Sequence, residues 1–423
     1  MSAWRIKIFR KGIVIFILLC SALSLFSQPS RSEDLELLDA RQWDFSKRLP
    51  LKCNWTFVEN KLLSPEALES EKSHSYVLFP ALWNDHRDDR KGLGFATYAL
   101  RVLIPDTLKT LAVEIPQLYS SYKLWVNGNL IVSAGTVGVD TETVVPQWIY
   151  QKVSFPNHQD TLQIVLQIAN FSHYKGGAKD PIYLGTPAII NRHFNWAIGS
   201  NVSGAIILLI EGAIFLFLYQ QKKKPVVLYL SLLCITWSLR SVFSDLYPVV
   251  LIFPEINWQL LVKVEYITLF LAAIWASLFF NHLFKDMSNV IFTYLPITLN
   301  MFFIVFTLLT PALIFSQWLS LYLGVEVLVI LYGASMIVRS LIMEREGSWF
   351  LIASVGVGIL LFGYNIAAFQ SSFSYNVVLL NIGYVVMFML TAIALLLHLS
   401  VLKSKNVKKE YLRYEDLFKS AKK

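Results

Sequence analysis

Long apolar runs in the second half of the chain set the strongest limit on how it can fold. Residues 196–402 contain only 16 charged residues in 207 positions, eight of each sign. A helix needs about 20 mainly apolar residues to cross a bilayer. Seven segments of this kind are present, at residues 197–219, 225–245, 258–283, 290–310, 317–339, 348–369 and 376–402. The sequence therefore predicts an all-α bundle of seven transmembrane helices over residues 196–402.

Basic residues in the loops predict how this bundle is oriented. The first, third and fifth loops contain Lys222–Lys224, Lys285 and Arg345, whereas the loops at residues 246–257, 311–316 and 370–375 contain no lysine or arginine. Cytoplasmic loops of membrane proteins are enriched in these two residues. We therefore expect a multi-pass protein of the bacterial inner membrane, with the region before the first span in the periplasm and the C-terminus in the cytoplasm.

The net charge of +8 is concentrated at the two ends of the chain, with +4 in residues 1–11 and +5 in residues 403–423. Basic residues followed by a short apolar stretch predict a signal peptide at residues 1–27, with an uncleaved membrane anchor as the alternative. The basic tail, residues 403–423, continues the last span in a helical spacing and suits contact with anionic lipid or with a separate cytoplasmic signalling protein. Because the charge flanks the membrane region, the sequence does not support nucleic-acid binding.

Residues 28–195 show the period of β-strands. Tyr98, Leu100, Val102 and Ile104 alternate with other residues, and a similar alternation follows at 161–168. The dipeptide Asn127-Gly128 lies between two β-rich runs and predicts a tight hairpin, because both residues tolerate positive φ. Several short strands with turns between them predict an all-β sandwich or jelly roll before the helices.

No catalytic motif stands out. The sequence contains no Gly-rich phosphate loop, no His-Glu-x-x-His motif and no Gly-x-Ser-x-Gly motif. The three cysteines are not spaced for a disulfide framework or a metal site. We therefore expect a protein that is not an enzyme and has no cofactor or metal.

Charged residues inside the spans are candidates for a polar network, because such residues are costly in hydrocarbon and tend to face the bundle interior. The candidates, from mid-span and outer positions, are Glu211, Arg240, Asp245, Lys263, Glu265 and Glu326. They either lock the bundle together or form a network that shifts when the outer domain moves. A transport role is a third interpretation, but it would favour broken spans.

Aromatic and amide residues near strand ends are candidates for ligand binding in the β domain. Aromatic faces that stack on a sugar ring, with amides that hydrogen-bond its hydroxyls, would form a carbohydrate site. The candidates are Tyr119, Tyr122, Gln147, Trp148, Asn170, His173 and Tyr174. The alternative for each is a place in the hydrophobic core or in an interface.

Several stretches of the β domain resemble one known family, the bacterial seven-transmembrane receptors with diverse intracellular signalling modules. They are Gly94–Val102, Tyr119–Gly128, Ala134–Gly138, Pro146–Trp148 and Asn170–His173. The resemblance implies an extracytoplasmic, galactose-binding-like jelly roll joined to seven helices that relay ligand occupancy to a cytoplasmic output. Since the chain ends about 20 residues after the last span, we expect that output to be a separate protein.

We therefore expect a transmembrane sensory receptor for a small molecule or carbohydrate, and a homodimer is compatible with the same pattern. The alternative is a transporter or envelope-assembly subunit that uses the β-sandwich as an adaptor.

Overall fold

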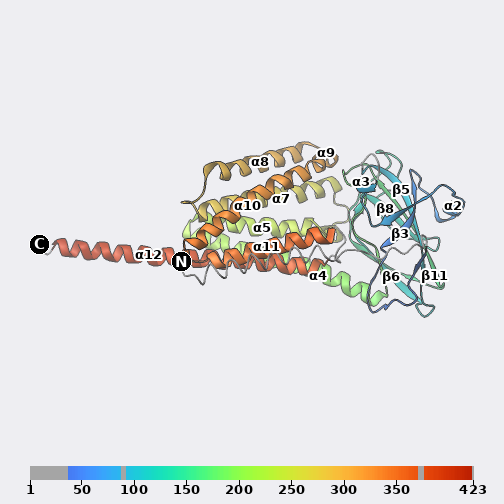
Figure 1. The fold of residues 1–423 in the computed structure, drawn as a ribbon, viewed down its shortest axis with the longest axis horizontal. Coiled ribbons are helices and arrows are strands. Elements are labelled where there is room, and N and C mark those ends of the chain that lie inside the picture. Colours follow the sequence, from blue (N-terminus) through green and yellow to red (C-terminus); the bar gives the residue numbers. More distant parts are fainter. Residues whose placement is uncertain (1–36, 87–91, 370–375, 422–423) are drawn as a thin grey trace.

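A β-sheet domain followed by a helical bundle makes up the chain. The computed structural model describes residues 37–86, 92–369 and 376–421. The sheets lie at one end of the helices, and the last helix projects from the opposite end (Figure 1). The predicted order of a β domain and then an all-α bundle is therefore confirmed. The predicted signal peptide, residues 1–27, lies outside the described residues.

The larger sheet holds the long strands in which the sequence shows a period of two. In spatial order it contains β4 (Ser75–Phe79), β3 (Cys53–Glu59), β5 (Gly94–Leu103), β11 (Thr161–Asn170), β8 (Ser121–Val126) and β9 (Asn129–Ala134), with β1 (Leu37–Asp39) parallel to β5. All pairs other than β1 and β5 are antiparallel. Tyr98, Leu100, Val102 and Ile104 are all at most 3% exposed, so the alternation correctly predicts their buried face.

A smaller sheet closes the other side of the sandwich. It contains β10 (Gln151–Pro156), β6 (Thr110–Ile115), β13 (Tyr183–Gly185) and β2 (Leu49–Pro50), and a short ladder joins β12 (Gly177–Ala178) to β7 (Leu118–Tyr119). Two short helices, α2 (Pro65–Glu69) and α3 (Trp83–His86), lie in the connections. Buried residues of both sheets, among them Trp55, Leu124 and Val113, form one hydrophobic core.

The predicted hairpin is present between β8 and β9. Asn127 and Gly128 occupy the turn with φ of 49° and 81°, as a type I′ turn requires. A Cβ atom built on Gly128 would meet no atom within 4 Å. Backbone conformation, rather than space, therefore favours glycine at this position.

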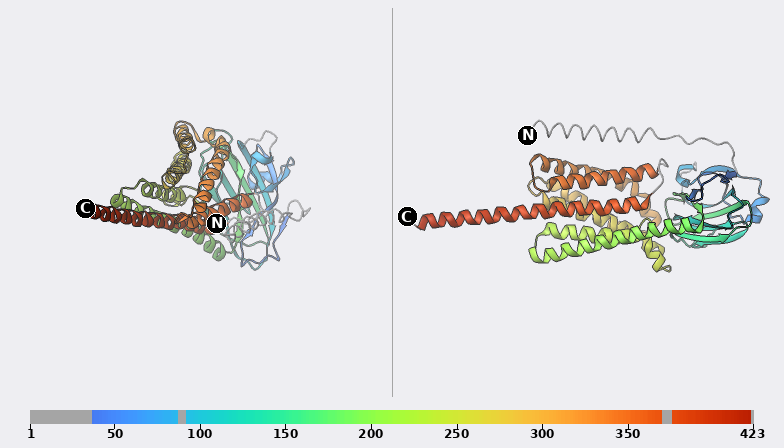
Figure 2. Two further views of the ribbon diagram at one scale, coloured as in Figure 1. Left: turned by 60° about the vertical axis from the view of Figure 1, so that its left-hand side comes forward. Right: turned by 90° about the horizontal axis from the view of Figure 1, so that it is seen from below.

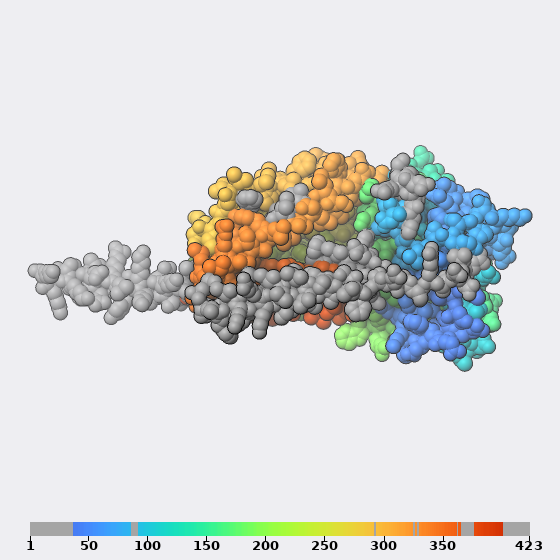
Figure 3. All heavy atoms as spheres, in the orientation of Figure 1, coloured from blue at the N-terminus to red at the C-terminus, as the bar shows by residue number. Residues whose placement is uncertain are grey.

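Seven long apolar helices follow the sandwich in the part of the chain that the structure describes. They are α4 (Pro187–Lys222), α5 (Pro225–Phe243), α7 (Trp258–Leu283), α8 (Val290–Leu309), α10 (Leu319–Ile342), α11 (Ser348–Phe369) and α12 (Val377–Ala421). Among the described residues, α4, α5, α7 and α12 contain windows long and apolar enough to cross a membrane, and shorter apolar stretches lie at Thr293–Leu309, Ile330–Ile342 and Ser348–Leu361. The sandwich forms a compact mass at one end of these helices (Figure 3).

The helices differ from the predicted spans mainly where they leave the bundle. The first span is predicted to begin at residue 197, but α4 begins at Pro187, almost three turns earlier, because its polar first turns pack against the sandwich. Helix α12 continues without a break through the tail to Ala421 (Figure 2). Two loops on the sandwich side contain short helices, α6 (Pro248–Ile252) and α9 (Ala312–Gln317).

Replacing Gly128 tests the hairpin. Gly128→Ala should lower the free energy of unfolding of the β domain by about 1–2 kcal/mol, because an L-residue is strained at positive φ and no side-chain clash contributes. Gly128→Asn is the matched control and should retain most of the stability, since asparagine tolerates this conformation. Thermal unfolding of the intact chain in detergent micelles measures both. Equal loss in the two variants would contradict this explanation.

Candidate functional site

The sandwich is joined to the bundle through the first turns of α4. Ile190 of α4 is completely buried, and the ring of Phe194 stacks on Tyr150, with 4.8 Å between ring centroids. Lys152 Nζ on β10 donates a hydrogen bond of 3.2 Å to Asn195 Oδ1. The start of the first membrane helix is therefore packed as part of the outer domain.

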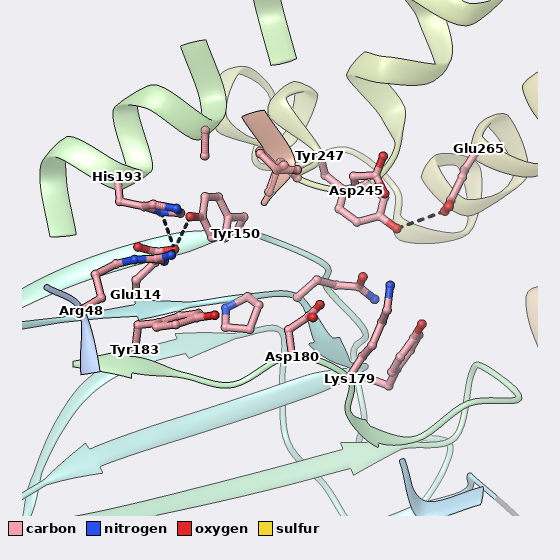
Figure 4. A pocket seen from close by; sticks show the side chains of 16 residues that line it. Arg48, Glu114, Tyr150, Lys179, Asp180, Tyr183, His193, Asp245, Tyr247 and Glu265 are labelled. Atoms are coloured by element: carbon pink, nitrogen blue, oxygen red, sulfur yellow. Dashed lines mark hydrogen bonds and ion pairs between the residues drawn. The ribbon is translucent and has the colours of Figure 1, made fainter. Parts of the chain in front are cut away.

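A buried carboxylate lies at the centre of this contact. Glu114 on β6 is 2% exposed. Its Oε1 atom accepts from Arg48 Nη1 at 2.7 Å and from the Tyr150 hydroxyl, and it lies 3.1 Å from His193 Nδ1 on α4. Figure 4 shows these side chains converging from the sheet and the helix. One carboxylate therefore links three side chains, of which one belongs to the bundle.

The surroundings of Glu114 keep it ionised. Burial by itself raises the pKa of this carboxyl group, but the hydrogen bond with His193 and the charge of Arg48 outweigh burial and lower the pKa below its usual value. The guanidinium of Arg48 also lies 3.9 Å above the ring of Tyr183. All three contacts are to Oε1, and Oε2 is buried with no hydrogen-bond partner among the described residues.

An aromatic cluster forms a second part of the junction. In the sandwich, the ring centroid of Trp148 lies 5.5 Å from that of Tyr119 and 5.2 Å from that of His173. Toward the bundle, it lies 5.5 Å from the ring centroid of Tyr247 and 5.2 Å from that of Trp258. Tyr119 and His173 stack at 5.0 Å. Three of the predicted ligand residues are thus brought together, but they pack against the bundle rather than line an open groove.

Burial in this cluster determines the state of His173. The side chain is 3% exposed. Its Nδ1 accepts from the backbone N–H of Lys175 at 3.1 Å, and its Nε2 has no partner among the described residues. Burial lowers the pKa of His173 to about 3. The imidazole is therefore neutral at ordinary pH.

The other predicted ligand residues are dispersed. Tyr122 is 1% exposed in the sandwich core, where its hydroxyl accepts from Gln151. Asn170 is fully buried and donates to the carbonyls of Gly92, His173 and Lys175, so it shapes the loop.

Gln147 and Tyr174 lie at the edge of the junction. Gln147 Oε1 accepts from the Gly135 N–H at 2.8 Å, and its Nε2 lies 3.5 Å from the Pro254 carbonyl in the bundle. The Tyr174 N–H donates to Ser316 Oγ on α9 at 3.1 Å. Direct ligand contact by any of these residues stays a prediction.

A cavity of about 160 Å³ lies between the Glu114 contact and the aromatic cluster. Side chains from the sandwich and from the bundle face each other across it (Figure 4). Its lining residues are Arg48, Glu114, Pro116, Gln117, Tyr119, Tyr150, Lys179, Asp180, Tyr183, His193, Ala197, Asp245, Leu246, Tyr247, Glu265 and Val377. Of the predicted site residues, Tyr119, Asp245 and Glu265 therefore share one cavity.

The predicted intramembrane residues divide among separate places. Arg240 Nη1 donates to the backbone carbonyl of Glu265 at 2.6 Å, and the Tyr247 hydroxyl donates to Glu265 Oε2 at 3.1 Å. Lys263 instead donates to the Leu308 carbonyl of α8 at 2.8 Å.

Two further candidates lie elsewhere in the bundle. Glu326 accepts from Asn300, which in turn accepts from Tyr322. Both carboxylate oxygens of Glu211 are buried without a hydrogen-bond partner among the described residues.

Sequence reasoning missed Arg48, Glu114, Tyr150 and His193. A signal was available, since Glu114 is the single charged residue in the otherwise mainly apolar strand Thr110–Ile115. A charge in such a run indicates a buried, partnered group. Its partners lie far apart in sequence, and no local pattern identifies them.

Acidification tests the neutral His173. The unfolded chain binds a proton near pH 6.5, whereas the folded chain does so only near the lowered pKa of about 3. The stability contribution is therefore present above pH 6.5 and is lost as the pH falls. When the pH falls from 7.5 to 5, the free energy of unfolding of the wild type should decrease by about 2 kcal/mol more than that of His173→Asn. Equal pH dependence of thermal unfolding in the two chains would contradict this.

Removing the charge of Glu114 tests the central contact. Glu114→Gln should lower the free energy of unfolding by about 3 kcal/mol, because it leaves Arg48 partly buried without its counter-charge. Glu142→Gln, at an exposed position of the same domain, is the control and should change stability by less than about 0.5 kcal/mol. Thermal unfolding of the intact chain measures both, and equal effects would show that the contact does not stabilise the junction.

Solved structures similar to this chain include three glycosidases, all of low similarity. A GH2 beta-galacturonidase from Eisenbergiella tayi bound to galacturonate is 12% identical, with 33% of this chain and 24% of that chain covered and a TM-score of 0.25. The Faecalibacterium prausnitzii beta-glucuronidase is 13% identical, with 37% of this chain and 32% of that chain covered and a TM-score of 0.25. The Ruminococcus gnavus beta-glucuronidase is 13% identical, with 32% of this chain and 27% of that chain covered and a TM-score of 0.26. The chain thus spans about a third or less of their lengths, and a likeness of this extent does not bear on what it binds.

The helical region gives the informative match. No curated protein matches the sequence. Residues 202–399 match the family model described as 7TM diverse intracellular signalling. The match begins within α4 and ends within α12, so among the described residues it includes parts of these two helices and the apolar helices between them. The description indicates a family of transmembrane sensory receptors. Over residues 202–399, the chain is therefore similar to the family of 7TM diverse intracellular signalling proteins.

Proposed function

We propose that this protein is a receptor whose β-sandwich senses a ligand outside the cytoplasm and whose helix α12 passes the signal to a separate cytoplasmic protein. The observation that carries the proposal is the continuity of two helices. Helix α4 begins inside the sandwich contact, and α12, which packs beside it, continues through the tail to Ala421. A displacement of the sandwich is therefore transmitted along α4, across the packed contact between α4 and α12, and along α12 to the tail. No loop lies on this path.

The contact with α4 makes this transmission direct. Gly185, the last residue of β13, is followed by Thr186 and then by the first residue of α4, Pro187. His193 and Phe194 fix the next turns to Glu114 and Tyr150. A helix held at both its start and its side moves with the sheet rather than independently of it.

The contact between α4 and α12 provides the next step. Asn381 Nδ2 donates to Ser200 Oγ at 3.1 Å. Gly204 of α4 also faces α12, since a Cβ atom there would lie 3.7 Å from Val385, at ordinary van der Waals distance. Small residues at such positions allow close helix packing within a membrane. A shift of α4 along its axis would therefore displace α12.

The proposed location is the bacterial inner membrane, with the sandwich in the periplasm and α12 ending in the cytoplasm. Lys222 and the following lysines lie at the end of α4 that is distant from the sandwich. Arg345 and Asp286 pair between the α10–α11 and α7–α8 loops, which lie at that same end. Basic loops opposite the sandwich support this orientation.

The carbohydrate ligand inferred from the resemblance stays part of the proposal, as do the basic tail's contact with a signalling partner and a homodimer. Transport is less well supported, because the seven helices run unbroken through the residues that the structure describes. Broken membrane helices would favour a transporter.

Cysteine labelling tests the orientation and the coupling together. In a chain with its native cysteines replaced, Ser404→Cys should react with a membrane-impermeant maleimide in inverted vesicles but not in spheroplasts. His193→Asn removes the contact of α4 with Glu114. It should change the labelling rate at residue 404 about two- to thirty-fold, which corresponds to a coupling free energy of about 0.5–2 kcal/mol.

The control for this experiment is the neighbouring position on α4. Arg192→Asn changes an exposed side chain and should leave the labelling rate unchanged. Labelling in spheroplasts would overturn the proposed orientation. Identical rates in wild type, His193→Asn and Arg192→Asn would overturn coupling between the sandwich and the tail.

A further inference from the structure

A groove with a volume of about 530 Å³ lies between α4 and α12, at the end of the bundle that meets the sandwich. It is lined by residues of α4 between Asn195 and Ile207 and by residues of α12 between Val378 and Val386. The two helices run side by side from the sandwich (Figure 2). Ligand pockets usually have volumes of about 300–1,000 Å³, so the groove has room for a ligand.

The groove extends through the half of the membrane nearer the sandwich. Trp196, which lines it, is 66% exposed and lies next to residue 197, the predicted start of the first span. Tryptophan is enriched at the interface between membrane and water. From Trp196 to Ile207, α4 advances about 16 Å at about 1.5 Å per residue. Half of the hydrocarbon core is about 15 Å thick, so the groove is as long as the acyl-chain region of one leaflet.

The lining changes from polar to apolar with depth. Asn195 and Asn381 lie toward the sandwich, whereas Ile207 and Val386 form the deep end. Both of these apolar side chains are exposed on the bundle. A phospholipid has the same distribution of polarity, with a polar headgroup above an apolar acyl chain.

Lys152 supplies positive charge at the polar end. Its Nζ donates a hydrogen bond of 3.2 Å to Asn195 Oδ1 and lies 4.7 Å from the ring centroid of Phe194. Among the described residues, no carboxylate forms an ion pair with Lys152, and no acidic residue lines the groove. Glu114, its neighbour across the strands, is paired with Arg48 at 2.7 Å. An ammonium group in this position therefore attracts an anion such as the phosphate of a lipid headgroup.

A second observation concerns hydrogen bonding inside the groove. Asn381 Nδ2 donates to Ser200 Oγ at 3.1 Å. In the part of the chain that the structure describes, Asn381 Oδ1 and the Ser203 hydroxyl have no hydrogen-bond partner. Hydrocarbon offers none to such groups. A glycerol headgroup carries hydroxyl donors and ester acceptors, and therefore supplies both kinds of missing partner.

Gly199 leaves the groove open on the side of α4. A Cβ atom built on this residue would meet no atom within 4 Å. A larger side chain at position 199 would therefore occupy the groove without striking the bundle. This makes Gly199 the position at which the groove can be filled while the packing of the helices is retained.

We propose that the groove binds an anionic phospholipid of the leaflet on the sandwich side, with its phosphate beside Lys152 and one acyl chain along Ile207 and Val386. The inference goes beyond the receptor proposal and does not depend on it. It requires only that α4 and α12 cross a bilayer, for which both contain long enough apolar windows. A second copy of the chain suits the groove less well, because an apolar helix would provide neither a counter-charge for Lys152 nor a donor for Asn381 Oδ1.

Native mass spectrometry of the intact chain, released from detergent micelles, tests the proposal with palmitoyl-oleoyl-phosphatidylglycerol as the probe. Palmitoyl-oleoyl-phosphatidylcholine has the same acyl chains and no net charge, and should bind at least about fivefold more weakly. Inorganic phosphate should neither bind nor displace the lipid, because it lacks the chain that fills the groove. Titration with each lipid gives an apparent Kd.

Filling the groove should prevent binding. Gly199→Leu should weaken the apparent Kd for phosphatidylglycerol at least about tenfold, because the new side chain overfills the space of the acyl chain. Gly324→Leu is the matched control. Gly324 lies on α10, outside the groove, and an added Cβ atom there also meets no atom within 4 Å. This control should leave the Kd unchanged.

Removing the charge of Lys152 tests the headgroup contact separately. In Lys152→Gln, the side chain keeps N–H groups but has no charge, so the preference for phosphatidylglycerol over phosphatidylcholine should fall about fivefold. Lys109→Gln, at an exposed position of the same domain, is the control and should leave this preference unchanged. The variant provides a test even if Gly199→Leu does not fold.

Any of three results would overturn the proposal. The first is an equal Kd for the two lipids in wild type, and the second is an equal Kd in Gly199→Leu and Gly324→Leu. The third is a dimer without lipid as the main species, which would indicate a second copy in the groove. None of them affects the receptor proposal, because labelling of residue 404 in the His193→Asn chain reports coupling whether or not a lipid fills the groove.

Discussion

The contact between Glu114 and the start of α4 is the interaction on which the rest of the structure depends. A charge placed in a β-strand core is costly unless it is paired and hydrogen-bonded. Glu114 meets this requirement by binding Arg48, Tyr150 and His193. Since His193 belongs to the first membrane helix, satisfying a buried carboxylate in the sandwich also fixes the bundle in place. The same contact therefore stabilises the outer domain and attaches it to the membrane helices.

The junction combines this polar contact with an apolar one. The rings around Trp148 fill the space on one side, and the carboxylates of Asp180 and Glu265 face a cavity on the other. Well-packed aromatic contacts resist small displacements. The cavity beside them leaves side chains of the two parts facing each other across unfilled space. The junction is thus tightly packed on one side and hollow on the other.

Much of the fold could be predicted because its signals are local. The apolar segments locate the helices within a few residues, apart from the start of α4 and the end of α12. The Asn127-Gly128 turn and the alternation around Leu100 locate strands of the larger sheet. The site could be predicted only in part. Tyr119, Trp148 and His173 do lie together, but Tyr122 and Asn170 are core residues. An aromatic or amide residue at a strand end has the same sequence signature whether it faces a ligand, the core or another domain.

The order of a β domain and a helical bundle follows from the sequence alone, because periods of two and long apolar runs reflect backbone geometry and the thickness of the bilayer. The pairing of Glu114 with His193, 79 residues away, and the meeting of Asp180 and Glu265 in the lining of one cavity depend on the folded arrangement. Such contacts depend on how separate elements pack, and a charged residue carries no local sign of the partner that will neutralise it. Where the two parts of the protein meet is therefore a property of the folded chain.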